Sequence, residues 1–452
     1  MGSTIELPLW LFILILLFAA VTAASHLLFP SVRWFFRRRM EKAVAQLNMR
    51  LERPIEPFRL ARRYDMIQRL IYQPDVAQAV ADRAAEQGIP ENVAFEEAKR
   101  YAREIVPSFS ASAYFGVAIR VARLLSTALY RVRLAHFDES GISNIPKDAT
   151  VVFVMNHRSN MDYVLVTYLA AERSALAYAV GEWARVWPLS RLIKAMGAYF
   201  IRRKSRNALY RKVLAAYVRL ATQGGVTQAM FLEGRLSLDG APQEPRKGLL
   251  KYITDGFDPE ARDVVFVPVA LNYDRVLEDR ILLEALARGG KGFRARISVI
   301  GGFFLKQLWL RLRGRFHRFG YAAVSFGRPL SLKAFGAHHA GEVAGPLAEE
   351  LMHRINAVVP VLPVPLVAAI IEDAAEPLSR ASIEAQFATW AVKLDATHVH
   401  MPRDDLSYAV EVGLRMLAQR RIVTKAEGCF SVNPQERPAL AFYANSIRHL
   451  LM

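Results

Sequence analysis

The hydrophobic and polar positions of this chain follow different patterns along its length. Residues 7 to 29 form an apolar run that contains no Asp, Glu, Lys or Arg. From about residue 36 to residue 135 the apolar positions recur at helical spacing, which predicts amphipathic helices. From about Asp138, short β-branched runs alternate with helical stretches, which is typical of an α/β sheet covered by helices on both faces. After Phe335 the helical pattern resumes.

The N-terminal apolar run is long enough to cross a membrane. Its 23 residues would form a helix of about 34 Å, against a hydrocarbon core of about 30 Å. The alternative is a cleaved signal peptide, but the preceding MGSTIE has no Lys or Arg and the run is long. Five basic residues follow the run, and the positive-inside rule then places the N-terminus outside and the rest in the cytosol; they are Arg33, Arg37, Arg38, Arg39 and Lys42. We therefore expect a retained anchor over residues 1–31 in the inner (cytoplasmic) membrane.

Residues 32–135 are predicted to be a helical, partly membrane-interfacial region. The pattern indicates helices over residues 75–87, 91–105 and 112–133. The last of these sets four arginines among aliphatic and aromatic residues, as an interfacial amphipathic helix does; they are Arg120, Arg123, Arg131 and Arg133.

Residues 136–335 are predicted to form the α/β domain, a mixed sheet flanked by helices. Its expected strands cover residues 151–155, 177–180, 229–234, 264–271, 295–300 and 322–327. Residues 336–452 are predicted to be mainly helical, with a Pro-rich hinge at 358–366. A helix followed by a hairpin at 414–434 is similar to the end of a winged helix.

Composition narrows the class of protein. The chain has 452 residues, of which 53% are hydrophobic, and its mean hydropathy is +0.13. These values exclude a disordered chain and favour membrane contact. The single cysteine, Cys429, excludes an internal disulfide framework and a Cys-rich zinc or iron–sulfur site, and it indicates a reducing compartment.

Charge adds a polyanionic partner to this picture. The net charge is +18, and residues 185–219 and 285–341 hold ten and eleven Lys or Arg with no acidic residue. Such a charge attracts nucleic acid, an anionic membrane face or phosphorylated substrates. Residues 342–452 instead carry ten basic and thirteen acidic residues.

The segment from Val151 to Arg173 is the most informative for chemistry. His157 follows a predicted buried strand, where α/β sheets place their sites, and Asp162 falls in the first turn of the next helix. If the turn folds back, Asp162 can accept the Nδ1 proton of His157 and leave Nε2 as a base. The alternative is structural, because Ser159-x-x-Asp162 before an apolar run is also a capping box.

The same histidine-to-aspartate spacing occurs a second time, at His400 and Asp405. That copy has no preceding apolar strand and lies in the acidic last quarter of the chain. We therefore expect His157, and not His400, to be the base.

Three further segments carry residue types suited to a phosphorylated substrate. GAYFIRRKSR contains Arg202, Arg203 and Lys204. FLEGRLSLDG, at a strand end, contains Glu233, Gly234, Arg235 and Ser237, and Lys247 follows shortly after. VPVALNYDRVLED has Pro268 inside a strand, where a missing amide donor marks an edge or an irregular turn.

Taken in order, NHRSNMD, GAYFIRR, FLEGRLSLDG and VPVALNYD resemble the four motifs of the glycerol-3-phosphate acyltransferase family, within the larger group of glycerolipid acyltransferases. Four motifs in order are far more specific than any one of them. The resemblance runs from about Asn144 to Phe335. It continues at the end of the chain, where YANSIRHLL is similar to the C-terminal signature of the bacterial membrane-bound enzymes.

The resemblance implies transfer of a fatty acyl group from acyl-CoA or acyl carrier protein to the sn-1 hydroxyl of glycerol 3-phosphate, giving lysophosphatidate. It implies His157 as base, Asp162 as its partner, and no metal or other cofactor. Anionic membrane lipid is a further expected partner. The implied substrate-binding residues, with Arg202 and Arg235 on the phosphate, are Arg202, Arg203, Lys204, Glu233, Gly234, Arg235, Ser237, Lys247 and Pro268. Glu233 would orient the glycerol hydroxyls, or alternatively pair with a nearby arginine.

The third motif departs from the family pattern Glu-Gly-x-Arg-Ser-Arg. Here Arg235 stands one place early, and Leu236 and Leu238 occupy the two Arg positions. Acylation of lysophosphatidate or another lysophospholipid is therefore the alternative within the same chemistry. A membrane-tethered nucleic-acid-binding protein is an alternative from another class, but residues 342–452, with a net charge of −3, have the wrong sign for it, and we expect no nucleic-acid partner.

Overall fold

The structure is a computed structural model, and it describes residues 8–170, 175–181, 189–202, 205, 207–289, 318–339, 341–394 and 399–452. The chain divides once, into a unit of residues Met1–Ile55 and a unit of residues Glu56–Met452. The boundaries expected from the sequence at residues 31, 135 and 335 stay predictions.

The first unit consists mainly of one helix, α1 (Leu9–Asn48), of 40 residues. After the helix the chain turns back, and the Ile55 amide donates to the Asn48 side chain at 2.9 Å. Among the residues that the structure describes, no helix combines the length and the apolar character that a membrane crossing needs. The anchor expected over residues 1–31, several of whose side chains fall outside the described part, stays a prediction.

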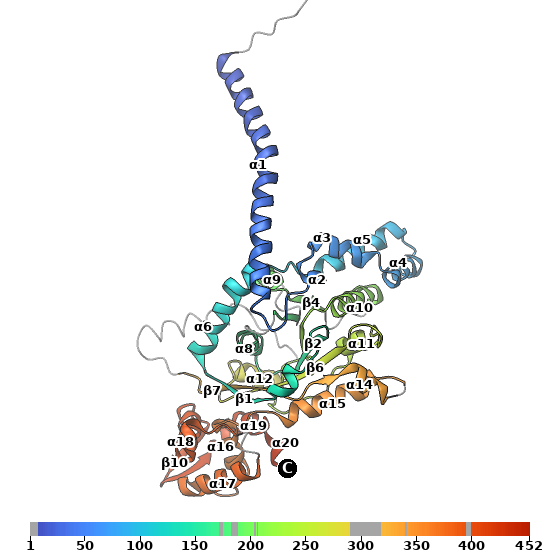
Figure 1. Cartoon of the computed structure of the whole chain (residues 1–452). Helices are drawn as coiled ribbons and strands as arrows, with labels where there is room; N and C mark the ends of the chain where they lie inside the picture. Colours follow the sequence, from blue (N-terminus) through green and yellow to red (C-terminus); the bar gives the residue numbers. More distant parts are fainter. Residues whose placement is uncertain are drawn as a thin grey trace, which may run out of the picture. The chain divides into compact units, whose positions relative to one another are not determined.

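A mixed sheet forms the centre of the second unit (Figure 1). Its strands lie in the order β1 (Arg131–Phe137), β7 (Tyr321–Phe326), β6 (Val264–Tyr273), β2 (Thr150–Met155), β5 (Gln228–Phe231), β3 (Ala177–Gly181) and β4 (Tyr199–Ile201), and β8 (Leu330–Ser331) also pairs with β6. Strands β6, β2, β5, β3 and β4 are parallel, whereas β7 runs antiparallel to β6. The α/β prediction with a mixed sheet is confirmed.

The predicted strands that fall in the described part are confirmed as β2, β3, β5, β6 and β7; residues 295–300 lie outside the described residues. Every residue of β2 and of β6 is buried, which explains their continuous apolar runs. Pro268 does not mark an edge strand, because β6 lies inside the sheet. Its missing amide falls between the residues that pair with β8 (Val265 and Phe266) and those that pair with β7 (from Val269).

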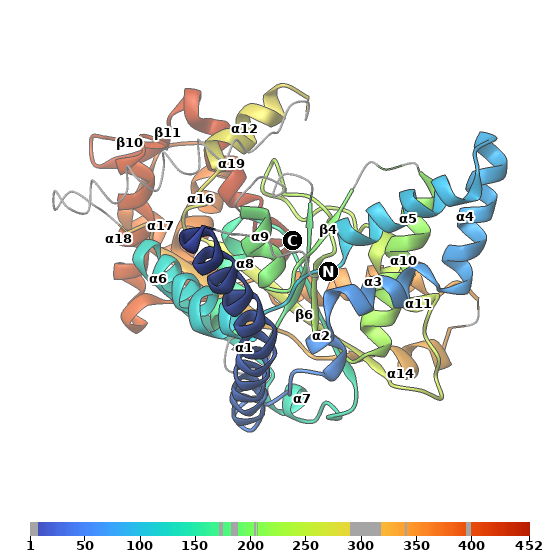
Figure 2. The same ribbon diagram turned by 90° about the horizontal axis from the view of Figure 1, so that it is seen from above.

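Helices cover the sheet much as the pattern predicts. Residues 75–87 and 91–105 are confirmed within α4 (Pro74–Gln87) and α5 (Glu91–Ile105), and both pack against α10 (Ala208–Gln223). Figure 2 shows these three helices together on one side, with α6 (Ile119–Leu129) and α8 (Met161–Leu169) on the other. The other helices of this part are α2 (Pro57–Leu60), α3 (Arg63–Ile71), α7 (Glu139–Ser143), α9 (Leu189–Ala195), α11 (Gly248–Thr254), α12 (Asp279–Ala287), α14 (Leu332–Ala337) and α15 (Ala344–Ala357).

The helix predicted over residues 112–133 is too long at its C-terminal end. A π-helical turn, η1 (Ser112–Ala118), leads into α6, which ends at Leu129. Tyr130 is extended, and Arg131 and Arg133 belong to strand β1. Pairing of β1 with β7 overrides the local helical pattern there.

The C-terminal part is mainly helical, as predicted, and appears in orange and red in Figure 1. It contains α16 (Pro363–Glu372), α17 (Arg380–Lys393), α18 (Leu406–Gln419), α19 (Arg437–Ala444) and α20 (Arg448–Leu451). The predicted helix and hairpin are α18 followed by β10 (Val423–Ala426) and β11 (Cys429–Val432), and β11 also pairs with β9 (Leu378–Ser379). The Pro-rich stretch begins α16, which has prolines in its first turn and packs against α18 and α19.

Candidate active site

His157 and Asp162 form a buried pair at the end of strand β2. The strand ends at Met155 and α8 begins at Met161, so both side chains flank one short turn. Asn156 fixes the start of that turn, because its side-chain amide exchanges two hydrogen bonds with the backbone of Leu271 in β6. His157 Nδ1 lies 2.9 Å from Asp162 Oδ2. The exposed fraction is 2% for His157 and 0% for Asp162.

Three further donors hold the Asp162 carboxyl group. Oδ2 accepts from the amides of Arg158 at 2.8 Å and Ser159 at 2.9 Å, and Oδ1 accepts from the Tyr273 hydroxyl at 2.6 Å. The bond to the Ser159 amide is the one a capping box requires, and Ser159 Oγ in turn accepts from the Met161 amide. Only this half of a capping box forms, because Ser159 Oγ accepts from the Met161 amide and not from the Asp162 amide. The Asp162 carboxyl group instead holds the turn before α8 and orients His157.

The surroundings of His157 come from β5 and the loop after it. The imidazole stacks on Phe231 with ring centroids 3.8 Å apart, and Tyr163 meets it edge-on. The His157 amide donates to Glu233 Oε2 at 3.3 Å, and the His157 carbonyl accepts from the Ser237 amide at 3.1 Å. The third motif thus packs directly on the backbone of the base.

Burial raises the pKa of Glu233 to about 8, against the opposing effect of the positive charge of Arg158. Gly234 occupies the left-handed region, with φ of 69°. The Ser237 hydroxyl donates within its own loop, to Ala241 O at 2.7 Å and to Asp239 Oδ1 at 3.1 Å. Arg235 is exposed and Leu236 is buried. Glu233, Gly234 and Ser237 therefore shape the loop beside the base, and Arg235 is its outward-facing cation.

Arg202 is engaged by a carboxylate. Its guanidinium binds Glu104 of α5 through Nε at 2.8 Å and Nη2 at 2.6 Å, and this hydrogen bonding holds the pKa of Arg202 above its usual range. The side chain also lies over the rings of Tyr101 and Tyr210. A phosphate would have to compete with Glu104 for this arginine, so its predicted phosphate role stays a prediction.

The other predicted substrate-binding residues lie apart from the pair. Pro268 is buried in the middle of the sheet, paired with Val154. Lys247 is exposed just before α11, with its ammonium group beside Gly345 of α15. Arg203 and Lys204 lie outside the described residues.

An apolar cavity of about 290 Å³ opens beside the pair. Asn160, Tyr163 and Thr167 of the turn and α8 line one wall, and residues of η1, α6, β3 and α9 line the others. Tyr163 contacts both the cavity and the His157 ring. The site therefore combines the buried His157–Asp162 pair with an adjoining apolar cavity.

Comparison with known proteins finds two family models on this chain. An acyltransferase model matches residues 136–272, and the glycerol-3-phosphate acyltransferase C-terminal region matches residues 305–452. Two curated relatives carry the name glycerol-3-phosphate acyltransferase. The one from Pseudomonas putida is 29% identical over 61% of this chain and 32% of its own length, and the one from Xanthomonas campestris is 26% identical over 86% and 46%. The two matched regions are thus similar to those of glycerol-3-phosphate acyltransferases.

The chain spans between about a third and a half of the length of these two relatives. Among solved structures, a 1-acyl-sn-glycerophosphate acyltransferase from Thermotoga maritima matches with a TM-score of 0.34 and 19% identity, over 53% of this chain and 77% of that one.

Two residues of this candidate site, Tyr273 and Glu278, were not predicted from the motif spacing. Tyr273 ends β6 and holds Asp162. Glu278 follows it, and its carboxyl group accepts from Ser159 Oγ at 2.7 Å and from the Asn160 amide at 3.1 Å. Burial raises the pKa of Glu278. The sequence did contain a signal for both residues, because they stand at and just after the end of a buried strand. The carboxyl ends of parallel strands lie at the same edge of a sheet, so polar residues there are expected near His157.

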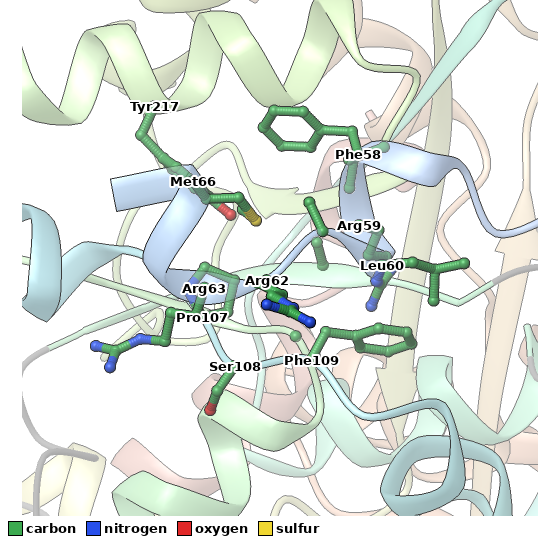
Figure 3. A pocket seen from close by; sticks show the side chains of 14 residues that line it. Phe58, Arg59, Leu60, Arg62, Arg63, Met66, Pro107, Ser108, Phe109 and Tyr217 are labelled. Atoms are coloured by element: carbon green, nitrogen blue, oxygen red, sulfur yellow. The ribbon is translucent and has the colours of Figure 1, made fainter. Parts of the chain in front are cut away.

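A second cavity, of about 240 Å³, lies at the opposite edge of the sheet (Figure 3), lined by Ala177 at the amino end of β3 and by Arg59, Arg62 and Arg63. The Arg59 guanidinium donates to Leu176 O at 2.9 Å and to Ala175 O, and it lies 4.1 Å from the Phe109 ring centroid. Burial lowers the pKa of Arg59 to about 10. Arg59 thus ties α2 to the start of β3, away from the His157–Asp162 pair.

In the part of the chain that the structure describes, no group of three His, Cys, Asp or Glu side chains is placed to hold a metal ion.

Proposed function

We propose that this chain transfers a fatty acyl group from a thioester donor to the sn-1 hydroxyl of glycerol 3-phosphate, giving lysophosphatidate. The observation that carries the proposal is the buried pair itself, with His157 Nδ1 2.9 Å from Asp162 Oδ2. The two matching family models support the acyl transfer, and the curated relatives' name supports the acceptor.

A hydroxyl group is a weak nucleophile near neutral pH, so it needs a base. With Nδ1 bound by Asp162, Nε2 of His157 takes the hydroxyl proton while the alcohol oxygen attacks the thioester carbonyl. When the tetrahedral intermediate collapses, the carbon–sulfur bond breaks and the imidazolium returns the proton to the leaving thiolate. General-base help of this kind contributes about 10² to 10⁴ in rate, and no covalent enzyme intermediate is required.

The donor's acyl chain suits the apolar cavity beside His157. Its lining includes Val121, Leu125, Tyr163, Val164 and Tyr178. Each methylene buried there contributes roughly 0.8 kcal/mol. A chain in this cavity would bring its thioester to the rim where Tyr163 and His157 meet. Acyl-CoA and acyl carrier protein are both proposed carriers.

The acceptor's phosphate suits the third-motif loop, which packs on the backbone of His157. Arg235 is the exposed cation of that loop, and a guanidinium can pair bidentately with phosphate oxygens. Arg202 could join only by exchanging Glu104 for the phosphate. Burial favours the protonated form of Glu233, and in that form its carboxyl group would donate a hydrogen bond to a glycerol hydroxyl.

The test is an acyl-transfer assay on the full-length chain in detergent, with acceptor and carrier varied separately. Radiolabelled glycerol 3-phosphate and lysophosphatidate are each offered with acyl-CoA and with acyl carrier protein as carriers. We expect labelled lysophosphatidate as the first product. Acylation of lysophosphatidate alone would move the assignment to the alternative acceptor.

We also propose that the enzyme works at the cytoplasmic face of the inner membrane, in contact with anionic lipid. This is supported by the exposed apolar side chains of η1 and α6, Val117, Val121 and Leu124, which alternate with Arg120 and Arg123. Flotation with vesicles that contain or lack anionic lipid tests it, and equal binding to both would remove the lipid preference.

A further inference from the structure

The last helices of the chain pack on the loops that surround the base. The Asn445 side-chain amide donates to Asp239 O, in the third-motif loop, at 3.0 Å. Next to it, Ser446 Oγ accepts from the side-chain amide of Asn272 at 3.2 Å. Asn272 lies in β6, in the fourth motif. Both contacts come from the segment YANSIRHLL, to which the catalytic mechanism gives no role.

The closest approach is between Gly240 and Phe442. Gly240 has φ of 84°, and a Cβ built on it would lie 1.9 Å from Phe442 O. The two backbones therefore touch only because position 240 has no side chain. The guanidinium of Arg158, the residue after the base, donates to Gly240 O and lies 5.6 Å from the Phe442 ring centroid. One contact thus joins the first motif, the third-motif loop and the end of the chain.

Tyr443 fixes the segment that follows the fourth motif. Its hydroxyl donates to Asp279 Oδ2 and accepts from Arg420 Nη1 at 2.7 Å and from the Val276 amide at 3.3 Å. Tyr443 and Asp279 are both buried, and Arg420 also pairs with Asp279. Tyr443 thereby holds the segment that carries Glu278. Glu278 in turn binds Ser159 and Asn160, so the C-terminal region supports the turn after His157.

We propose that residues Phe442–Ser446 position the catalytic loops, so that the C-terminal region is part of the acyltransferase site. The inference rests on the proposed acyl transfer. Its physical basis is that the loop from Glu233 to Gly240 binds the backbone of His157 through the Glu233 carboxyl group and the Ser237 amide. The same loop is fixed on its outer side by Phe442 and Asn445. Loosening this outer side displaces the acceptor-facing residues Glu233 and Arg235 first.

The strongest test replaces Gly240 with Ala. The added methyl group must displace Phe442 O, so we expect acyl transfer to fall more than a hundredfold. Gly341→Ala is the matched control, because Gly341 also has positive φ, 96°, but nothing lies within 4 Å of its Cβ position. It should keep wild-type activity. Equal activity of both variants would overturn the proposal.

A gentler variant covers the case in which Gly240→Ala fails to fold. Asn445→Ala removes one side-chain hydrogen bond, and we expect the KM for the acceptor to rise by roughly three- to tenfold with the KM for acyl donor unchanged. Asn433→Ala removes a similar bond beside the exposed hairpin, to Arg421 O at 2.9 Å, together with the bond that Asn433 accepts from the Gln435 amide at 3.2 Å. It should change neither constant. A merely structural role would lower the melting temperature without this division between the two substrates.

Hydrogen–deuterium exchange of the full chain tests the same contact without an activity assay. We expect faster exchange of the amides between Leu236 and Gln243 in Asn445→Ala and no change in Asn433→Ala. If the wild type transfers no acyl group but this exchange difference is found, the proposed function fails and the positioning contact stands. Unchanged exchange in Asn445→Ala would refute the positioning role even if the enzyme is active.

Discussion

The chain contains the same histidine-to-aspartate spacing twice, and the two copies fold differently. In the first, His157 and Asp162 are buried just after the carboxyl end of strand β2 and share a hydrogen bond. In the second, the His400 amide pairs with Val361 O, its ring meets Tyr321 edge-on, and burial lowers the pKa of His400 to about 4. Asp405 turns away and accepts from the Tyr408 amide at 3.0 Å.

The position of the aspartate relative to its helix separates the two. Asp405 is the N-cap of α18, so its carboxyl group is taken by the helix's own first turn. Asp162 lies two positions after the N-cap, inside α8. Its oxygens accept from the Arg158 and Ser159 amides and from the Tyr273 hydroxyl, and Oδ2 also binds His157. A strand that ends just before the histidine, and a helix that begins just before the aspartate, therefore bring the two side chains of a common spacing into a hydrogen-bonded pair.

The largest expected contrast is between Asp162→Asn and Asp405→Asn. The first should lower kcat by about 10³ to 10⁴, because an amide no longer fixes the histidine tautomer or stabilises the imidazolium. Asparagine is as good an N-cap as aspartate, so the second should leave kcat and the melting temperature nearly unchanged. Steady-state kinetics with both variants checks this, and similar losses in the two would remove the distinction.

Tyr273→Phe tests the outer support of the first copy. Loss of the hydroxyl bound to Asp162 Oδ1 should lower kcat by about tenfold, with both KM values close to wild type. Tyr130→Phe is the control, since Tyr130 is also buried, lies 5.3 Å from Tyr273 between ring centroids, and donates to Arg275 O instead. If both variants lose the same activity, Tyr273 supports packing and not the base.

Substitution of Arg202 is expected to have a smaller effect, a several-fold change in the KM for the acceptor. If the phosphate displaces Glu104, Arg202→Ala should raise the KM for the acceptor several-fold, and Glu104→Gln should lower it because the guanidinium is released. If the pair is structural, both variants should lower the melting temperature and leave the two KM values in their wild-type ratio. Thermal unfolding and kinetics on the same preparations separate these outcomes.

The smallest effect is in the pH dependence of stability. The pKa of Glu233 is raised to about 8 in the folded chain, against about 4.3 when unfolded. Between these values the folded state binds more protons, so stability falls as pH rises and levels off above about pH 8. Burial raises the pKa of Asp274 to about 7, which acts in the same direction.

We therefore expect the melting temperature to fall by a few degrees between pH 7.0 and pH 8.5, and Glu233→Gln to flatten that slope. His400→Ala should leave the slope unchanged, because the lowered pKa of His400 keeps it neutral in the folded chain throughout this range. A steeper slope in Glu233→Gln would contradict the raised pKa of Glu233.

Local patterns predict much of this molecule. Strands β2 and β6 are visible as continuous apolar runs because both of their faces are buried. His157 and Asp162 are visible because five residues and one turn bring them together. Strand β1 was missed because it lies at one end of the sheet, where Arg131 and Arg133 remain exposed and its apolar signal is weak.

Contacts between distant parts of the chain are beyond such patterns. Tyr273 reaches Asp162 across 111 positions, and Glu104 reaches Arg202 across 98. Neither has a local signature, because each depends on which helix or strand becomes the neighbour. The arginine cluster around Arg202 therefore suggested a phosphate site without revealing the carboxylate that occupies it.

The most direct measurement is acyl transfer to glycerol 3-phosphate by purified His157→Ala beside His400→Ala, with the melting temperature of each recorded. The account predicts that His157→Ala has a melting temperature close to that of the wild type and a rate of acyl transfer lower by a factor of at least about 10². It predicts that His400→Ala stays active. Full activity in His157→Ala would contradict the assignment of this imidazole as the base.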